Sequence, residues 1–183
     1  MAGMSPSLTV LVVCRGNLCR SPLAERLFRL RTPKSRVLAS SAGVDAAVGE
    51  PMDPLAADEL IRLGGDPSGF VARQLTPSMA LDADLVLTAS RRIRSEVVML
   101  VPSALKRTFT LLELAALLKE PPWTGSTEGL AATLAKASDW RASVSPLGDA
   151  LDVPDPIGRP PRVHREAADL IDAATELIAA RLS

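Results

Sequence analysis

The chain has 183 residues, of which 47% are hydrophobic and 23% are charged. This composition excludes a disordered or fibrous chain and fits one globular domain with a real core. Lysines and arginines together number 21, and so do aspartates and glutamates. Because the chain has no net positive charge that would attract a polyanionic surface, we expect neither a nucleic-acid nor a membrane partner.

The cysteine and histidine usage is sparse, with two cysteines and a single histidine. Two cysteines do not make a disulfide scaffold, and they favour a reducing compartment, so we expect a cytoplasmic protein. Cys14 and Cys19 lack the Cys-x2-Cys spacing of a zinc site, and His164 lies far off in the sequence. We therefore expect no metal and no cofactor. Residues 1–7 lack the pattern of a targeting segment and are expected to be a flexible N-terminus.

The first element in chain order is a strand. Residues 8–13 form a short apolar run rich in β-branched side chains, which predicts a strand buried on both faces. The pair Ser21-Pro22 predicts the start of a helix, with the Ser21 hydroxyl as N-cap. Helical spacing then predicts one core-facing stripe of leucines at Leu23, Leu27 and Leu30.

Further strands and helices alternate along the rest of the chain. The pattern predicts strands at residues 36–40, 84–88 and 107–110, and helices at residues 54–63, 93–101, 111–118, 128–138 and 162–182. This alternation predicts an α/β fold with a four-stranded parallel, doubly wound sheet and helices on both faces, in a single domain spanning residues 1–183. In such sheets, ligands bind beyond the carboxyl ends of the strands, which is where Cys14 falls.

The turn between the first strand and the first helix holds Cys14 and Arg20, with five residues between them. A loop of this length can curl around one phosphate, with backbone N–H groups pointing inward and the positive end of the helix beside them. Gly16 is expected to take a φ angle that a residue with a Cβ would resist. The Arg20 fork can grip two phosphate oxygens, and cationic surroundings favour Cys14 as a thiolate nucleophile.

The fuller string Cys-x-Gly-Asn-x-Cys-Arg-Ser-Pro at residues 14–22 resembles the phosphate-binding loop of the low-molecular-weight protein tyrosine phosphatases. The resemblance covers residues 9–75, 83–118 and 151 onward, whereas residues 120–148 look like an insertion that the family does not usually carry. It implies a metal-free protein phosphatase that hydrolyses phosphotyrosine-type phosphomonoesters through a phosphocysteine intermediate. The implied partners are a phosphorylated protein and inorganic phosphate or a similar oxyanion.

A general acid is the second requirement of this chemistry, because the leaving oxygen needs a proton. Asp155-Pro156 matches the family's Asp-Pro motif. By that resemblance Asp155 protonates the leaving group and then activates the water that hydrolyses the phosphocysteine. Spacing alone would favour a turn or N-cap role for Asp155. Asp152 is the alternative acid.

The resemblance also implies roles for the remaining loop residues. Ser21 hydrogen-bonds the thiolate and eases its departure, and Asn17 fixes the strained loop with Ser41 as its partner. Cys19 either pairs with an oxidised Cys14 or is a small buried residue. Backbone N–H groups that bind the phosphate are expected from Arg15, Gly16, Asn17, Leu18 and Cys19.

The sequence departs from the family pattern at the substrate rim and in the Asn17 network. Phe70 stands where many members have a histidine in that network, so the network must be closed differently. Where members that prefer phosphotyrosine carry aromatic side chains, this chain has Ala46 or Ala47 and Ile157-Gly158. We therefore expect the family's chemistry to be kept, while the missing aromatic side chains leave the preferred substrate undefined.

Three other functions share parts of this pattern. A phosphoarginine phosphatase of the same fold has a threonine at the position of Leu18, and the leucine favours the aryl ester. A thioredoxin-coupled arsenate reductase needs further cysteines beyond Cys14 and Cys19, which the chain lacks. A non-catalytic phosphate-binding or phosphoprotein-binding module needs no acid, so the presence of Asp155 argues against it.

Overall fold

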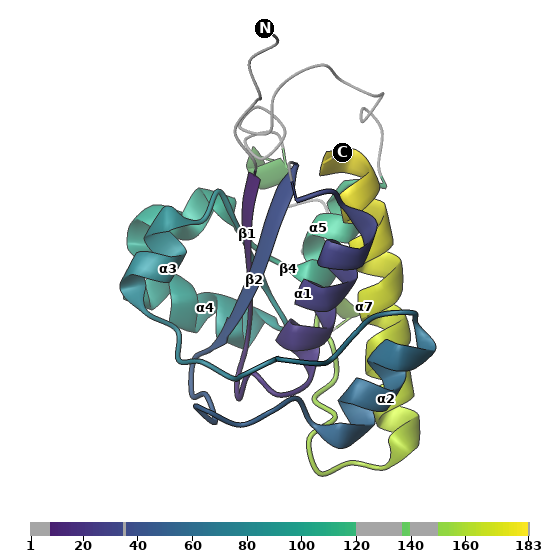
Figure 1. Cartoon of the computed structure of the whole chain (residues 1–183). Coiled ribbons are helices and arrows are strands. Elements are labelled where there is room, and N and C mark those ends of the chain that lie inside the picture. Colours follow the sequence, from purple (N-terminus) through teal and green to yellow (C-terminus); the bar gives the residue numbers. More distant parts are fainter. Residues whose placement is uncertain (1–7, 35, 120–136, 140–149, 183) are drawn as a thin grey trace, which may run out of the picture.

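The structure is a computed structural model, and it describes residues 8–34, 36–119, 137–139 and 150–182 (Figure 1). The expected flexible N-terminus, residues 1–7, lies outside the described residues. So do all but three residues of the expected insertion at 120–148 and most of the helix predicted at 128–138. The domain boundaries drawn from the sequence therefore stay a prediction.

Four parallel strands form one sheet, as predicted. They are β1 (Leu8–Cys14), β2 (Val37–Gly43), β3 (Leu85–Thr88) and β4 (Thr108–Thr110), in the order β2-β1-β3-β4. β1 pairs in parallel with both β2 and β3, and β3 pairs with β4. This confirms the predicted α/β fold class, with β1 at the centre of the sheet.

Helices cover both faces of the sheet (Figure 1). The elements are α1 (Arg20–Arg31), α2 (Pro54–Arg62), α3 (Pro77–Asp82), α4 (Arg91–Leu100), the 3-10 helix η1 (Pro102–Arg107), α5 (Leu111–Leu117) and α7 (Pro161–Leu182). α1, α2, α5 and α7 lie on one side, while α3 and α4 lie on the other. α3 was not predicted, because its six residues are too few to show helical periodicity.

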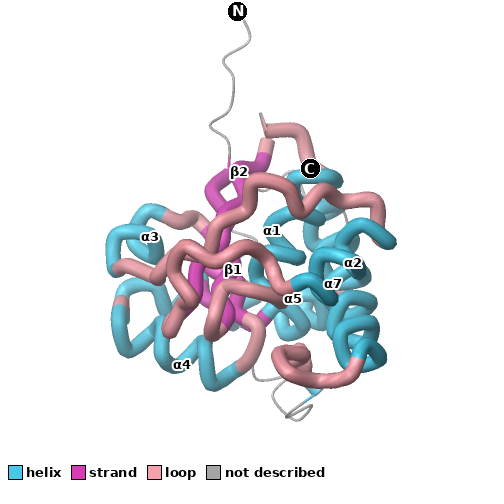
Figure 2. The backbone as a smooth tube through the Cα atoms, turned by 60° about the horizontal axis from the view of Figure 1, so that its bottom comes forward, coloured by secondary structure: helices cyan, strands magenta, loops and turns pink. Residues whose placement is uncertain are grey.

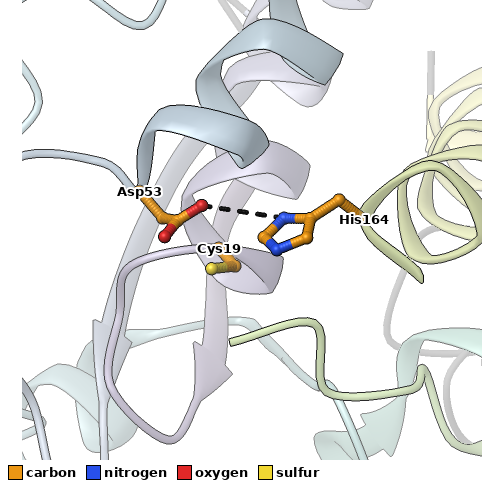
Figure 3. A group of neighbouring side chains, drawn as sticks. All are labelled: Cys19, Asp53 and His164. Atoms are coloured by element: carbon orange, nitrogen blue, oxygen red, sulfur yellow. Dashed lines mark ion pairs between the residues drawn. The ribbon is translucent and has the colours of Figure 1, made fainter. Parts of the chain in front are cut away.

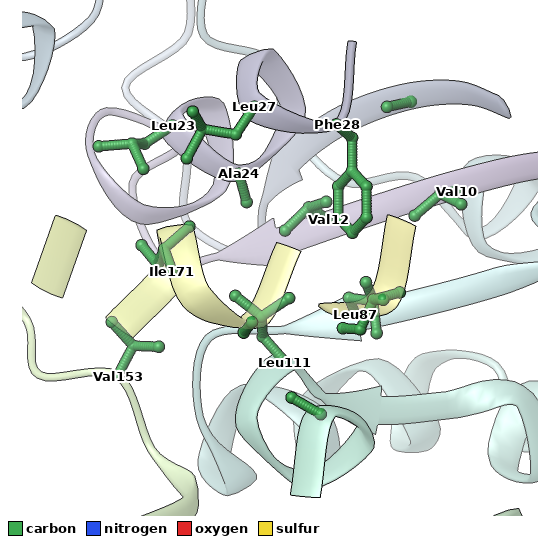
Figure 4. Packing of buried hydrophobic residues seen from close by; sticks show 14 of the residues in the cluster. Val10, Val12, Leu23, Ala24, Leu27, Phe28, Leu87, Leu111, Val153 and Ile171 are labelled. Carbon is green, nitrogen blue, oxygen red and sulfur yellow. The ribbon is translucent and has the colours of Figure 1, made fainter. Parts of the chain in front are cut away.

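The side chains of β1 alternate between two hydrophobic clusters. Val10 and Val12 pack with residues of α1, α5 and α7, as Figure 4 shows, whereas Leu11 and Val13 face α4. A strand that buries both faces carries an unbroken apolar run, which explains the composition of β1. In α1, Leu23 and Leu27 are buried as predicted, but Leu30 is 53% exposed and Phe28 fills this part of the core instead.

The loops that follow β1 and β2 and the loop that precedes α7 gather at the carboxyl edge of the sheet, which Figure 2 turns toward the viewer. Cys14 ends β1 at this edge, so the sheet places it where ligands bind in doubly wound folds. None of the helices in the described ranges is long and apolar enough to cross a membrane.

Candidate active site

The loop from Cys14 to Arg20 is held by its carbonyl oxygens. Four of them accept hydrogen bonds from backbone N–H groups of residues 44–53, at 3.0–3.1 Å: Cys14 from Val44, Arg15 from Asp45, Gly16 from Ala47 and Leu18 from Asp53. The described residues contain no cis peptide bond, and in a trans peptide the N–H that follows a carbonyl points the opposite way. The N–H groups of residues 15, 16, 17 and 19 therefore turn toward the inside of the loop, as an anion nest requires.

Gly43 makes this close approach of two backbone segments possible. A Cβ built at Gly43 would lie 2.3 Å from the carbonyl oxygen of Arg15 and 3.0 Å from the backbone nitrogen of Asn17. Any other residue at the end of β2 would therefore push the loop away. Sequence analysis placed no requirement on Gly43, because the requirement arises from pairing with Cys14 across two strands.

The strained residue of the loop is Asn17 and not Gly16. Among the described residues, Asn17 is the one non-glycine with a positive φ, at 56°. A Cβ at Gly16 would contact only the Leu18 side chain, at 3.8 Å. The expectation that Gly16 supplies an unusual φ is therefore wrong. Asparagine is among the residues that tolerate the left-handed region.

The Asn17 side chain is fully buried, and both its Oδ1 and its Nδ2 make hydrogen bonds. Its Oδ1 accepts from the backbone N–H of Arg73 at 2.9 Å, and its Nδ2 donates to the hydroxyls of Ser21 (2.9 Å) and Ser41 (3.0 Å). Since the Arg73 amide can only donate, the orientation of the Asn17 amide is fixed. The predicted Ser41 partnership is therefore present, and the Arg73 backbone closes the network in this chain.

Glu25 anchors the far end of the network. Ser41 donates its hydroxyl proton to Oε2 of Glu25 at 2.5 Å, and the Arg29 guanidinium pairs with Oε1 at 2.7 Å. Glu25 is buried, so its charge needs these partners. Sequence analysis missed Glu25, because a glutamate in the first turns of a helix looks like an ordinary surface residue.

Ser21 contacts the cysteine rather than the helix end. α1 begins at Arg20, its N-cap is Cys19, and no side chain caps it. The Ser21 hydroxyl instead lies 2.9 Å from Cys14 Sγ, with the Ala42 carbonyl oxygen at 3.4 Å. The N-cap role predicted for Ser21 is therefore wrong, while the contact with Cys14 implied by the family resemblance is present.

Cys14, Arg20 and Asp155 line a single pocket of about 120 Å³. The other lining residues are Arg15, Gly16, Leu18, Cys19 and Ile157. The Arg20 guanidinium is 8% exposed, donates to the carbonyl oxygen of Val153 at 3.2 Å and pairs with Asp155 Oδ2 at 2.7 Å. The Asp155 carboxylate is 47% exposed. The structure thus brings together three residues that the sequence separates by up to 141 positions.

The segment that carries Asp155 is tied to the sheet edge just before it. Val153 donates its N–H to the Ala89 carbonyl, and Thr110 Oγ1 donates to the Leu151 carbonyl, both at 2.8 Å. Asp152 accepts from the backbone N–H of Arg91 at 2.7 Å, at the start of α4. Asp152 is not among the residues that line the pocket, so this geometry favours Asp155 over Asp152 as the acid.

Aliphatic side chains stand at the pocket rim. Leu18 and Ile157 line the pocket, and Ile157 is 46% exposed. The Arg15 side chain pairs with Glu96 of α4 at 2.9 Å. Cys14 and Cys19 are both free thiols, and burial together with the neighbouring Asp53 raises the pKa of Cys19. Cys19 is therefore a neutral thiol at ordinary pH.

A nest of backbone N–H groups that holds a cysteine, with an arginine and a carboxylate at its mouth, defines a class: α/β proteins that bind a tetrahedral oxyanion over a nucleophilic sulfur. Comparison with known sequences names the family. The profile of the family "Low molecular weight phosphotyrosine protein phosphatase" matches residues 9–139, and the chain belongs to this family. The predicted family is therefore confirmed. Asp155 lies beyond the matched range.

Individual relatives agree with this assignment. The low molecular weight protein-tyrosine-phosphatase Etp of Escherichia coli strain K12 is 40% identical over 100 residues, which cover 55% of this chain and 66% of Etp. The aligned part is thus just under two thirds of Etp.

Two solved structures share the fold. The YwlE arginine phosphatase from Geobacillus stearothermophilus superposes with a TM-score of 0.71 and 27% identity, covering 96% of this chain and 92% of that one. Vibrio vulnificus Wzb in complex with benzylphosphonate superposes with a TM-score of 0.70 and 24% identity, covering 96% and 99%.

Proposed function

We propose that this chain hydrolyses phosphotyrosine-type phosphomonoesters of proteins through a phosphocysteine intermediate. The observation that carries the proposal is the convergence of Cys14, Arg20 and Asp155 on one small pocket. A thiol, a guanidinium and a carboxylate in contact with the same space supply the nucleophile, the anion clamp and the acid of this reaction.

Oxyanion binding falls to the loop and the helix behind it. The inward N–H groups of residues 15, 16, 17 and 19 and the positive end of α1 favour a dianionic phosphoryl group. The Arg20 guanidinium adds a charge-assisted, bidentate contact. Its hydrogen bond to the Val153 carbonyl keeps the guanidinium aimed at the pocket, so little side-chain entropy is lost when the anion binds.

The nucleophile is Cys14 at the floor of the pocket. Asn17 Nδ2 donates to the Ser21 oxygen, so the Ser21 hydroxyl proton can be donated to the Ala42 carbonyl oxygen at 3.4 Å or to Cys14 Sγ, which at 2.9 Å is the nearer acceptor when it is a thiolate. This hydrogen bond stabilises the thiolate form that attacks phosphorus, and it stabilises the same thiolate when it leaves in the second step. The Glu25–Ser41–Asn17 chain orients the Asn17 amide that donates to Ser21.

The acid and base of the reaction is Asp155. In the first step its carboxylic acid protonates the oxygen of the leaving alcohol while the P–O bond breaks and the S–P bond forms. In the second step the carboxylate takes a proton from the water that attacks phosphorus, and Cys14 departs as thiolate. The half-exposed position of Asp155 at the pocket mouth lets it reach both the leaving group and water.

The substrate class follows from the rim. Leu18 and Ile157 offer apolar contact to an aryl leaving group without an aromatic stack. The solved structure of Wzb holds benzylphosphonate, in which one CH2 group joins a benzene ring to phosphorus where an aryl phosphate has an oxygen. A second candidate is protein phosphoarginine, favoured by the similarity to the YwlE arginine phosphatase. Leu18 argues against it, since the phosphoarginine phosphatases carry threonine there.

The compartment proposed with this activity is the cytoplasm. A nucleophilic thiolate next to a second thiol stays reduced only where disulfides are disfavoured, and both cysteines are free. The proposed partners are phosphorylated proteins and inorganic phosphate or a similar oxyanion.

A substrate panel tests the proposal. Peptides that carry phosphotyrosine, phosphoserine or phosphoarginine are supplied to the full chain, and released phosphate is measured. We expect phosphotyrosine to give the highest kcat/KM, and the variant Cys14→Ser to bind oxyanions without turnover. Highest kcat/KM on phosphoarginine would shift the assignment to the second candidate. Full activity of Cys14→Ser, or binding without turnover by the natural chain, would overturn the phosphatase assignment.

A further inference from the structure

Three potential metal ligands meet directly behind the phosphate-binding loop. Cys19 comes from the loop, Asp53 from the start of α2 and His164 from the first turn of α7, as Figure 3 shows. One ligand atom from each residue lies within 4.8 Å of the other two. The large sequence separation of His164 from Cys19 was the ground for expecting no metal centre, and that separation disappears in the fold.

His164 has no hydrogen-bond partner for one of its ring nitrogens. The residue is 3% exposed, and its buried Nδ1 finds no partner among the described residues. Oδ1 of Asp53 is the facing atom at 3.6 Å, close enough for an ion pair when the imidazole is protonated, as the dashed line in Figure 3 marks, but beyond hydrogen-bond distance. Burying a polar group without a hydrogen bond is costly, so a native structure seldom keeps one without a use.

The space beside these atoms is small and lined mostly by nonpolar side chains. A pocket of about 10 Å³ is lined by Cys19, Arg20 and His164, together with nonpolar residues that include Leu23, Ala56 and Ile171. That volume holds roughly one water-sized particle. An apolar shell around a few donor atoms is also the setting in which a metal–ligand bond competes best with water.

We propose that Cys19, Asp53 and His164 form a binding site for a divalent metal ion of the zinc class. A set of one sulfur, one imidazole nitrogen and one carboxylate oxygen suits borderline ions such as Zn²⁺ rather than the hard ions Mg²⁺ and Ca²⁺. Three protein ligands leave the fourth tetrahedral position to water. The ligand atoms would close in by about 1 Å, because zinc bonds are ~2.0–2.3 Å long.

Charge and proton balance agree with this site. Binding replaces the thiol proton of Cys19, so an S–H bond breaks, an S–Zn bond forms and the proton passes to solvent. The thiolate and the Asp53 carboxylate then neutralise the two charges of the ion. Asp53 Oδ1 faces His164 and also accepts from the Ala56 N–H at 3.1 Å as the cap of α2, and its two lone pairs allow it to keep this bond while it binds the metal.

The site is joined to the proposed active site through Cys19 and its neighbour Arg20. Both residues line the phosphate pocket and the small pocket behind it. A metal that holds the Cys19 sulfur toward α7 withdraws this thiol from reaction with alkylating agents or with Cys14. Metal binding therefore has a readout that does not depend on phosphatase turnover.

The composition of the chain allows metal binding to be assigned to single residues. The natural sequence has one histidine and two cysteines, so the variant Cys14→Ser, freed of any affinity tag, offers Cys19 and His164 as its sole thiol and imidazole. We expect this protein to bind one equivalent of Zn²⁺ with release of a proton, measured by calorimetry in two buffers. We expect Co²⁺ to give the absorption bands of a tetrahedral cobalt thiolate, and Zn²⁺ to slow alkylation of Cys19.

Three further changes in the Cys14→Ser chain distinguish Zn²⁺ bound at this site from Zn²⁺ bound elsewhere on the protein. His164→Phe fills the same apolar space and should weaken Zn²⁺ binding by more than about 100-fold, since loss of an outer-shell partner alone costs 10–100-fold. Asp53→Asn keeps a good helix cap but should also weaken binding. Asp155→Asn removes the carboxylate of the neighbouring phosphate pocket and should leave Zn²⁺ affinity within a few-fold. Circular dichroism and thermal unfolding check that each variant is folded.

Several outcomes would overturn the site. Absence of Zn²⁺ and Co²⁺ binding to the Cys14→Ser chain would do so. So would binding that His164→Phe leaves intact, or binding that Asp155→Asn abolishes, because the ion would then lie in the phosphate pocket.

Discussion

The hydroxyl oxygen of Ser21 lies 2.9 Å from the sulfur of Cys14, seven residues earlier in the chain. Asn17 Nδ2 donates to the oxygen of that hydroxyl, whose own proton can be donated to the sulfur or, at the longer distance of 3.4 Å, to the Ala42 carbonyl oxygen. The neutral thiol gains little from such a donor, whereas the thiolate gains a charge-assisted hydrogen bond. The pair therefore favours each state in which Cys14 carries negative charge.

Ser21→Ala should slow the release of phosphate from the phosphocysteine, because the departing thiolate loses its donor. A hydrogen bond to a charged group contributes about 1.5–3 kcal/mol, so kcat should fall roughly tenfold to a hundredfold. Rapid mixing with an aryl phosphate should then show a burst of phenol followed by slow turnover. A variant that keeps the natural kcat and shows no burst would remove Ser21 from the mechanism.

Sequence reasoning located the loop because its residues are contiguous. Apolar residues, a Cys-to-Arg spacing and a Ser-Pro pair all lie within residues 8–22, where local preferences are strong. Glu25 and the Arg73 backbone were missed, because their roles depend on contacts across the sheet that no local pattern reports. The same lack of long-range information placed the strained φ at Gly16 instead of Asn17.

The proximity of His164 to Cys19 shows most clearly what sequence distance alone fails to predict. Sequence distance suggested separation, but α7 returns along α1 and brings its first turn to the phosphate loop. The signal that could have found this contact is the apolar neighbourhood of His164. Its neighbours Val163 and Ala167 lie on the buried stripe of the helix, which predicts a buried histidine as well.

Gly43→Ala should abolish oxyanion binding while the sheet stays folded. The new Cβ would lie 2.3 Å from the Arg15 carbonyl oxygen. Because the clash is with backbone atoms and not with a flexible side chain, the loop itself has to move. Displacing the loop misaligns the N–H groups that hold the anion, so phosphate protection against thermal unfolding should vanish.

Gly16→Ala provides the matched comparison for Gly43→Ala, since its Cβ would make ordinary contact with Leu18 and meet no backbone. We expect Gly16→Ala to keep most of its phosphate-dependent rise in melting temperature. Equal losses in the two variants would mean that the space at Gly43 is not what shapes the loop.

Asp155→Asn should lower kcat by about 10²–10⁴-fold for substrates with poor leaving groups, because the leaving oxygen then departs without a proton. For an activated leaving group such as a nitrophenolate, the loss should be much smaller. The same variant should bind phosphate or vanadate more tightly, since the Arg20 guanidinium no longer pairs with a carboxylate at 2.7 Å.

Asp152→Asn is the control for Asp155→Asn. Asp152 accepts from the Arg91 N–H at the start of α4 and does not line the pocket, so its loss should affect stability more than leaving-group dependence. A strong leaving-group dependence in Asp152→Asn, with none in Asp155→Asn, would transfer the acid role to Asp152.

Cys19 should make the folded protein lose stability at high pH. Burial, followed by the charges of Asp53 and Cys14, raises the pKa of this thiol well above its ordinary value of 9.0. Above that value the unfolded chain releases the proton while the folded chain keeps it. The unfolded state therefore binds fewer protons, and the free energy of unfolding falls as pH rises, by up to about 1.4 kcal/mol per pH unit. Below 9.0 both states keep the proton and this contribution is fully present.

Urea denaturation across the alkaline range can isolate this effect when it is done in the Cys14→Ser chain with and without Cys19→Ala. Every other titrating group is common to the two proteins, so the difference between their stability curves belongs to the Cys19 thiol. We expect that difference to be flat below pH 9.0 and to change steadily above it, with the Cys19 protein losing stability faster. Parallel curves through the alkaline range would mean that the thiol ionises as readily in the folded state as in the unfolded state, and hence that Cys19 is in contact with solvent.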